Sequence, residues 1–139
     1  MQIMKWLSIA TLALLIYSCF QPWVTIESQN IMVTGMKAEA INFGKPGLLH
    51  IVLSIIMMML LLLNKLWSFK TAFFVSAFNI AWSLRNFISI SACSAGICPT
   101  KHIALYTILI TPVAATVFLL LINKEVPVKK NEILTPREV

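Results

Sequence analysis

Four long apolar segments separated by short polar stretches constrain this chain more than any other feature. They cover residues 6–20, 48–63, 71–92 and 103–122. A bilayer core about 30 Å thick requires roughly 20 helical residues, with a range of about 17–25. Backbone groups inside a bilayer must also bond within their own segment. The pattern therefore predicts four transmembrane helices, the first two of which gain length from flanking interfacial residues.

Composition supports the same class. Of the 139 residues, 59% are hydrophobic and 12% are charged, against about 45–50% and about 25% in soluble domains. A chain this short cannot hide so much apolar surface in a soluble globule. An ordinary cytosolic enzyme, a disordered tail and a nucleic-acid module are therefore excluded. The formal net charge of +6 does not indicate a nucleic-acid partner, because the charges form short clusters between apolar runs.

The basic residues predict the orientation. One side would hold Lys5, Lys65, Lys70, Lys124, Lys129, Lys130 and Arg137, and the other would hold Lys37, Lys45 and Lys101. Lys and Arg favour the cytoplasmic side of a membrane. We therefore expect a protein of the cell inner membrane with both termini in the cytoplasm. The lipid bilayer is then the first expected partner.

The expected fold class is an all-α membrane protein, a four-transmembrane-helix bundle with a small β-hairpin in the first outer loop. The transmembrane domain would cover 1–123, and its helices are expected at about 5–21, 47–66, 70–91 and 103–123. The outer loop would cover 22–46, and 124–139 would form a disordered cytoplasmic tail.

The hairpin is expected from two stretches of the outer loop. Trp23-Val-Thr-Ile-Glu-Ser and Ile31-Met-Val-Thr-Gly-Met both alternate and are rich in β-branched residues, with Gln29-Asn30 between them. That pattern is typical of two paired strands. Because an isolated hairpin is only marginally stable, it should pack on the helix ends or on a partner. Its candidate outer contact surface comprises Trp23, Glu27, Glu39, His50 and His102.

Cys93 and Cys98 lie in the second outer loop, where a short segment with Gly96 can bring the two sulfur atoms together. A structural disulfide is the leading interpretation, because outer loops face an oxidising compartment. The alternatives are a redox-active pair, two free thiols, or a metal site that adds His102 and His50. The last has poor spacing for zinc, so no metal is expected. Cys19, near the end of the first segment, leaves a separate alternative open for that segment, a lipoprotein signal with Cys19 as the lipidated residue.

The third segment is the most polar of the four. Ser76, Asn79, Ser83 and Asn86 recur at helical spacing and share one face, with Trp82 and Arg85 on an adjacent stripe. Such residues commonly join transmembrane helices, and they could also form a pocket for a ligand or lipid headgroup. Arg85 is the one charge within a segment, and we expect it to be buried and to organise a polar pocket in the outer leaflet. The alternative is that its side chain reaches the lipid phosphates.

Pro112 falls inside the fourth segment, where it should kink the helix. Thr107, Thr111 and Thr116 would then bond the backbone groups that the proline frees.

Several known families share this architecture. Size and topology are similar to the four-helix membrane disulfide oxidoreductases and the vitamin K epoxide reductases, although this chain has no C-x-x-C and only three cysteines. A first helix followed by an outer hairpin with Trp23 resembles the topology of claudins, whose cysteine pair lies in the first outer loop rather than the second. Phe20-Gln-Pro-Trp-Val24 and Cys93…Cys98-Pro99 are similar to elements of small bacterial four-helix inner-membrane proteins, a resemblance that implies no activity.

Acidic residues are absent from all four segments, and no phosphate-binding loop, nucleophile elbow or zinc-protease helix occurs. We therefore expect no enzyme, no cofactor and no catalytic residue. The expected role is interaction, scaffolding or accessory-subunit function, with another membrane protein or with itself. The first alternative is a small carrier or a channel-like oligomer. The second is a membrane thiol oxidoreductase that uses Cys93 and Cys98.

Overall fold

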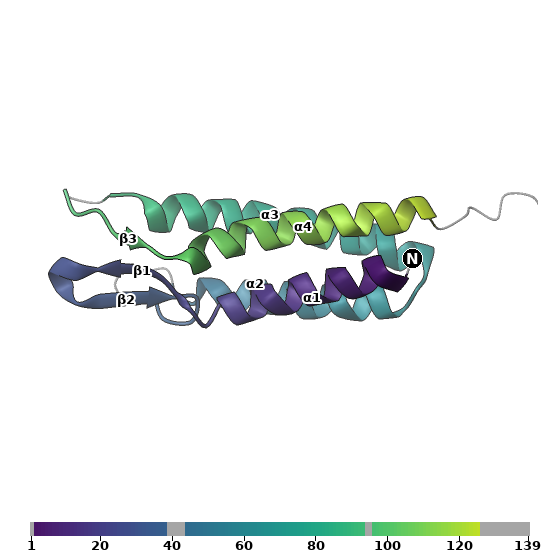
Figure 1. Cartoon of the computed structure of the whole chain (residues 1–139), viewed down its shortest axis with the longest axis horizontal. Coiled ribbons are helices and arrows are strands. Elements are labelled where there is room, and N and C mark those ends of the chain that lie inside the picture. Colours follow the sequence, from purple (N-terminus) through teal and green to yellow (C-terminus); the bar gives the residue numbers. More distant parts are fainter. Residues whose placement is uncertain (1, 39–43, 94–95, 126–139) are drawn as a thin grey trace, which may run out of the picture.

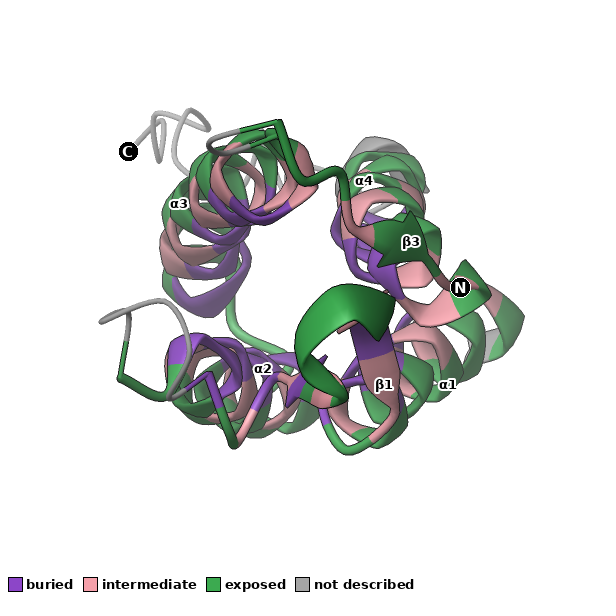
Figure 2. Cartoon of the chain, turned by 90° about the vertical axis from the view of Figure 1, so that its left-hand side faces the viewer, coloured by how far each residue is buried: buried purple, intermediate pink, exposed green. Residues whose placement is uncertain are grey.

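The computed structural model describes residues 2–38, 44–93 and 96–125, and this part is mostly helical. Four helices make up its length: α1 (Gln2–Ser18), α2 (Pro46–Leu62), α3 (Leu66–Ser91) and α4 (Ile103–Glu125). They form a ring, because α1 and α3 each pack against both α2 and α4. Figure 2 views this ring end-on, from the side of the strands, and shows the buried faces of the helices turned toward its centre.

A small sheet lies at one end of the bundle (Figure 1). It contains β1 (Pro22–Ile26), β2 (Ile31–Thr34) and β3 (Thr100–Lys101) in the order β2-β1-β3, with β1 antiparallel to both neighbours. A short 3₁₀ turn, η1 (Glu27–Gln29), joins β1 to β2 and ends at Asn30, which is left-handed with φ 52°. The hairpin prediction is confirmed, and β3 is an addition from the second loop that the sequence did not indicate.

The helix bounds differ from the expected ones. α1 lies about three residues earlier than expected and ends at Ser18, whose carbonyl accepts a 2.8 Å hydrogen bond from Trp23 Nε1. α2 ends at Leu62, because Asn64 adopts φ 51° and stops the helix. α3 begins at Leu66, four residues before its expected start. α4 continues through Pro112 to Glu125, and most of the expected disordered tail, 126–139, lies outside the described residues.

Among the described residues, one helix is both long enough and apolar enough to cross a membrane. This is α4 over Ile103–Ile122, with a mean hydropathy of 2.3. Ile3–Ser18 and Pro46–Leu62 are apolar but shorter.

Two apolar clusters fill the centre of the bundle at different heights. The sheet-end cluster comprises Leu15, Cys19, Trp23, Val24, Val33, Ala38, Ile90, Leu105 and Ile108. The turn-end cluster, near the connection of α2 to α3, comprises Leu12, Met57, Leu61, Phe69, Ala72, Ala115, Leu119 and Ile122. Between these two clusters the centre of the bundle is polar.

Candidate functional site: a buried polar layer

The polar stripe of α3 faces the centre of the bundle. Ser76, Asn79, Ser83 and Asn86 are all fully buried. They follow one another at intervals of three or four residues, which places them on one side of a helix. On the same helix Ile90 belongs to the sheet-end cluster and Ala72 to the turn-end cluster. The stripe therefore crosses the bundle between its two apolar clusters.

His50 of α2 sits against this stripe. Its Nδ1 lies 2.5 Å from Asn79 Oδ1, and its Nε2 lies 3.3 Å from Asn86 Nδ2. An amide oxygen can only accept and an amide nitrogen can only donate. The network therefore assigns a neutral imidazole that donates from Nδ1 to Asn79 and accepts at Nε2 from Asn86. Ser54, one turn further along α2, is also fully buried. We call His50, Ser54, Asn79, Ser83 and Asn86 the polar layer.

The placement of His50 corrects its assignment to an exposed contact surface. Because α2 begins at Pro46, His50 lies a full turn inside the helix. Ser54, Met57 and Leu61 follow it at helical spacing and are buried with it. In the sequence, His50 stands at helical spacing from the apolar residues Met57 and Leu61. This spacing could have identified His50 as a core residue.

Ser83 bonds the backbone of the neighbouring helix at the proline. Pro112 has no N–H, so the carbonyl of Ile108, four residues earlier, loses its helical donor. Ser83 Oγ donates to that oxygen at 2.6 Å. The threonines that were expected to do this act elsewhere. Thr107, Thr111 and Thr116 each donate to the carbonyl four residues before them, at Ile103, Thr107 and Pro112.

A second side-chain link joins the same two helices. The hydroxyl of Ser76 is hydrogen bonded to the hydroxyl of Thr116. This contact links α3 to α4.

Some polar atoms of the layer remain without a partner. Among the described residues, the buried side-chain atoms with no hydrogen bond are Ser8 Oγ, Ser54 Oγ, Asn79 Nδ2 and Asn86 Oδ1. Three of these four belong to the polar layer. A buried polar group without a partner costs about 1–3 kcal/mol, so this layer has a hydrogen-bonding capacity that the described residues do not fill.

Arg85 does not join the layer, and the expectation that it is buried is wrong. Its side chain is exposed, and its Cζ lies 4.8 Å from the centre of the Trp82 ring. At about 100° per residue, Arg85 points some 200° away from the buried Ser83. Trp82 is half-buried, and its Nε1 donates to the carbonyl of Pro46 at 3.1 Å. Arg85 is three residues further along α3, so it lies near the level at which α2 begins.

The remaining expected surface residues divide three ways. Trp23 is fully buried, since β1 is irregular between Pro22 and Val24 and turns the indole onto the end of α1. His102 is half-buried, with Nε2 2.7 Å from Thr25 Oγ1. Glu27 is exposed at the hairpin tip, and Glu39 lies outside the described residues.

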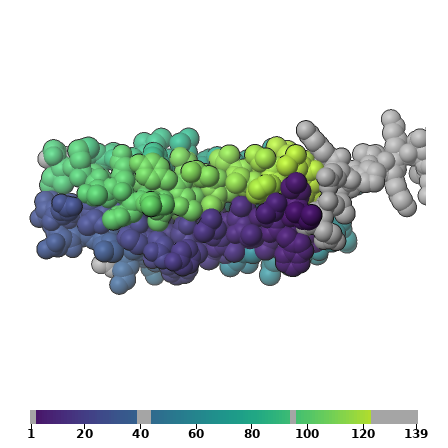
Figure 3. All heavy atoms as spheres, viewed as in Figure 1, coloured from purple at the N-terminus to yellow at the C-terminus, as the bar shows by residue number. Residues whose placement is uncertain are grey.

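A depression of about 370 Å³ lies beside His102 between α1 and α4. Its polar lining residues are Tyr17, Ser18, Gln21, His102 and Thr107. Figure 3 shows α1 and α4 side by side along this face of the molecule.

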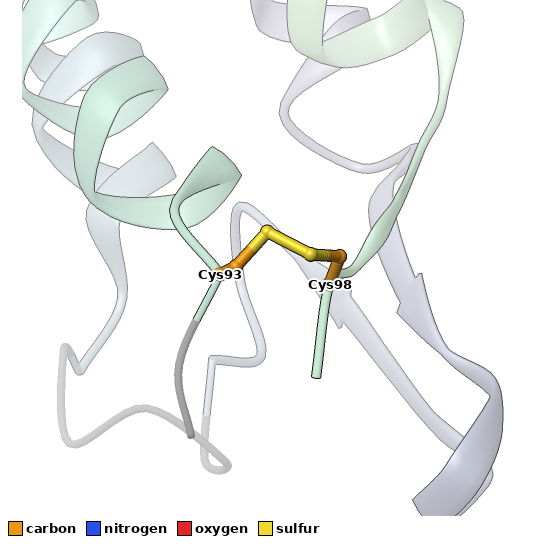
Figure 4. Close-up of a disulfide and its surroundings, with 2 residues drawn as sticks. All are labelled: Cys93 and Cys98. Atoms are coloured by element: carbon orange, nitrogen blue, oxygen red, sulfur yellow. A yellow bond between two sulfur atoms is a disulfide. The ribbon is translucent and has the colours of Figure 1, made fainter. Parts of the chain in front are cut away.

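Cys93 and Cys98 lie at bonding distance, with their sulfur atoms 2.03 Å apart. The bridge joins the end of α3 to the segment that leads into β3 (Figure 4). Cys19 is a free thiol, fully buried directly after α1. Burial raises the pKa of the Cys19 thiol to about 12.

The described residues contain no group of three or more His, Cys, Asp or Glu side chains that could hold a metal ion. No protein-family model, no curated protein and no solved structure matches this chain.

Proposed function

We propose that this chain is a four-span protein of the inner membrane whose sheet end is a rigid contact platform for another membrane protein or for a second copy of itself. Both termini lie in the cytoplasm in this arrangement. The role is that of an interaction, scaffold or accessory subunit, and it requires no catalytic chemistry of the chain.

The membrane placement rests on an inverted distribution of polarity. Large apolar side chains cover the outside of the helices: Phe74 is 73% exposed, Met59 is 64% exposed and Ile110 is 63% exposed. The fully buried residues of the same helices include His50, Asn79 and Asn86. A soluble bundle places these two classes the other way round. Lipid around the helices explains both, because it solvates apolar surface and confines polar groups to the interior.

Helix length supports the proposal of four spans. α1 and α2 each have 17 residues, or about 25 Å at 1.5 Å per residue, near the lower limit for a bilayer core. Exposed Lys65 and Lys70 lie at the turn end, where Lys5 Nζ donates to Asn64 Oδ1. Exposed Lys37, Lys45 and Lys101 lie near the sheet end. The proposed cytoplasmic position of the turn end therefore rests on the basic residues that the sequence adds toward its C-terminus, Lys124, Lys129, Lys130 and Arg137.

The interaction role rests on how firmly the sheet is fixed to the bundle. Trp23 Nε1 donates to Ser18 O, and the backbone N–H of His102 donates to Trp23 O at 2.9 Å. Gly47 N donates to Gly35 O at 2.7 Å. A surface held in one conformation loses little entropy on binding. Its exposed part includes Glu27, Ser28 and Met32.

The closed interior favours this role over a carrier or channel. The polar layer is flanked by the sheet-end cluster and the turn-end cluster, both made of fully or nearly fully buried apolar side chains. A solute that crossed the bundle would have to displace both clusters. Interiors packed to this degree resist such a change.

Two cysteine variants test the topology. Ser28→Cys adds a thiol at the hairpin tip and Lys65→Cys adds one at the turn between α2 and α3, both at exposed positions. In intact cells a membrane-impermeant maleimide should label Ser28→Cys and not Lys65→Cys, and opened membranes should restore labelling of Lys65→Cys. The unsubstituted chain is the control. Labelling in the opposite order would overturn the proposed orientation.

Photo-crosslinking tests the contact platform. A photoreactive residue at Met32 should give a discrete adduct in native membranes, whereas one at Trp67, exposed at the opposite end, should not give that adduct. Equal adducts from both ends, or none from Met32, would refute the platform. An adduct of twice the chain mass identifies a second copy as the partner.

A further inference from the structure

We propose that the polar layer binds water inside the bundle, with Asn79 Nδ2 as the donor to a bound water and Asn86 Oδ1 as the acceptor from one. The inference concerns the centre of the ring of helices. It holds whichever way the protein is oriented and whatever contacts the sheet.

The first step is that the orientation of the two amides does not matter. Each amide presents one polar atom to His50 and has the other one without a partner among the described residues. Turning an amide by 180° exchanges its oxygen and nitrogen. One donor or acceptor of each amide would still have no partner. Unfilled capacity is therefore a property of the site and not of one assignment.

The second step is that neighbouring hydroxyls are already engaged. Ser83 donates to Ile108 O, Thr111 donates to Thr107 O, and Ser76 is paired with Thr116. Ser54 Oγ is the exception, and it too is buried without a partner among the described residues. It lies one turn from His50 on the same face of α2, so it adds a third group that can bond to water.

The third step concerns the chemistry of the ligand. It must accept from an amide N–H and donate to an amide oxygen, and it must be small, because the site is enclosed by two apolar clusters. The members of the polar layer are hydroxyls, amides and an imidazole, with no carboxylate, ammonium or guanidinium group among them, so an uncharged ligand matches the layer. Water meets all of these requirements, and buried waters typically make about three hydrogen bonds to groups of this kind.

The same enclosure gives the water a distinctive property. Apolar side chains stand between the polar layer and both ends of the bundle, so a water molecule can leave only when the packing opens. Its residence should therefore be long compared with that of surface water. The contact between this water and the side chain of Asn79 should therefore last long enough for solution spectroscopy to detect it in the unsubstituted, folded chain.

The test is nuclear magnetic resonance of the ¹⁵N-labelled full-length protein in lipid nanodiscs. The Asn79 side-chain N–H₂ should show cross-relaxation with water in which the laboratory-frame and rotating-frame signals have opposite signs, as for a long-lived bound molecule. The exposed Asn64 amide is the matched control and should lack this signature. An Asn79→Leu variant serves to assign the resonance.

The result that would overturn the proposal needs only the unsubstituted chain. An Asn79 amide whose contacts are confined to protein or lipid protons would exclude bound water. Signals of equal sign at Asn79, which indicate chemical exchange with bulk solvent, would show that the layer is open and would also overturn it. Neither result bears on the labelling pattern of Ser28→Cys, so the two proposals can fail separately.

Discussion

The backbone N–H of Gly47, at the start of α2, donates to the carbonyl of Gly35, directly after β2, at 2.7 Å. Neither position has room for a side chain. A Cβ on Gly47 would lie 2.8 Å from Gly35 O, and a Cβ on Gly35 would lie 2.6 Å from both Cys19 O and Trp23 Cζ2. The bond gives one of the unpaired N–H groups at the helix start an acceptor. It also fixes the sheet to α2.

Alanine at these glycines should destabilise the chain. Gly47→Ala and Gly35→Ala each force backbone atoms apart, and we expect a loss of about 1–3 kcal/mol or more in unfolding free energy. Gly44→Asn is the control, because Gly44 has φ +66° with nothing within 4 Å of a Cβ, and Asn tolerates that region. Thermal unfolding in detergent followed by circular dichroism measures all three. Equal midpoints for Gly47→Ala and Gly44→Asn would contradict the close approach.

A double-mutant cycle can isolate the bond between Ser83 and the proline-freed carbonyl of Ile108. Ser83→Ala removes the side-chain donor to that oxygen and should cost about 1–3 kcal/mol. Pro112→Ala restores a backbone N–H to α4. In that background Ser83→Ala should cost less than in the natural chain, and the difference is the coupling energy.

Thr107→Ala is the control for this cycle. Its hydroxyl bonds a carbonyl on the same helix, at Ile103, where no proline removes the backbone donor. Its loss should be small in both backgrounds. Additive costs for Ser83→Ala and Pro112→Ala would show that the hydroxyl does not replace the missing helical bond.

The sequence predicted the elements better than their contacts. The four apolar segments located the helices, and the β-branched alternation located the hairpin. The period of the α3 stripe placed Asn79 and Asn86 on one face. The contact of His50 with both amides depends on the register between α2 and α3, which residue spacing within one helix does not determine. β3 is only two residues long, and its pairing depends on where the second loop returns.

The depth of Arg85 was misjudged for a related reason. The expected third helix began at residue 70, and its midpoint placed Arg85 within a membrane core. The observed helix begins at Leu66 and extends past the start of α2. Composition gives the length of an apolar run well. The offset between neighbouring helices depends instead on turns such as the one at Asn64.

Substitutions at two adjacent positions of α3 should therefore destabilise the chain to different extents. Arg85→Leu loses an exposed contact with the Trp82 ring, and such a contact is worth about 0.5–1 kcal/mol. Asn86→Leu leaves His50 Nε2 buried without its donor and should cost about 1–3 kcal/mol. Unfolding midpoints of the two purified variants can be compared directly. A larger loss for Arg85→Leu than for Asn86→Leu would restore the hypothesis of a buried arginine.

The three cysteines should differ in their reactivity. Cys93 and Cys98 are expected to resist alkylation without reductant, because their sulfur atoms are bonded. Cys19 is also expected to resist it at pH 8, for a different reason. Its thiol is buried and its pKa is raised to about 12, so the reactive thiolate is scarce well below that pH. Denaturant without reductant should expose Cys19 alone, and denaturant with reductant should expose all three.

Mass spectrometry of the alkylated peptides distinguishes these outcomes. Reduction of the folded chain should lower its unfolding free energy by about 2 kcal/mol or less. A disulfide that closes a 15-residue loop stabilises by about 3 kcal/mol, and the shorter loop here restricts the unfolded chain less. The bundle should remain folded, because its contacts lie on the four helices and not in this loop. Alkylation of Cys93 and Cys98 in the folded, unreduced protein would rule out the bridge, and global unfolding on reduction would show that it holds the bundle together.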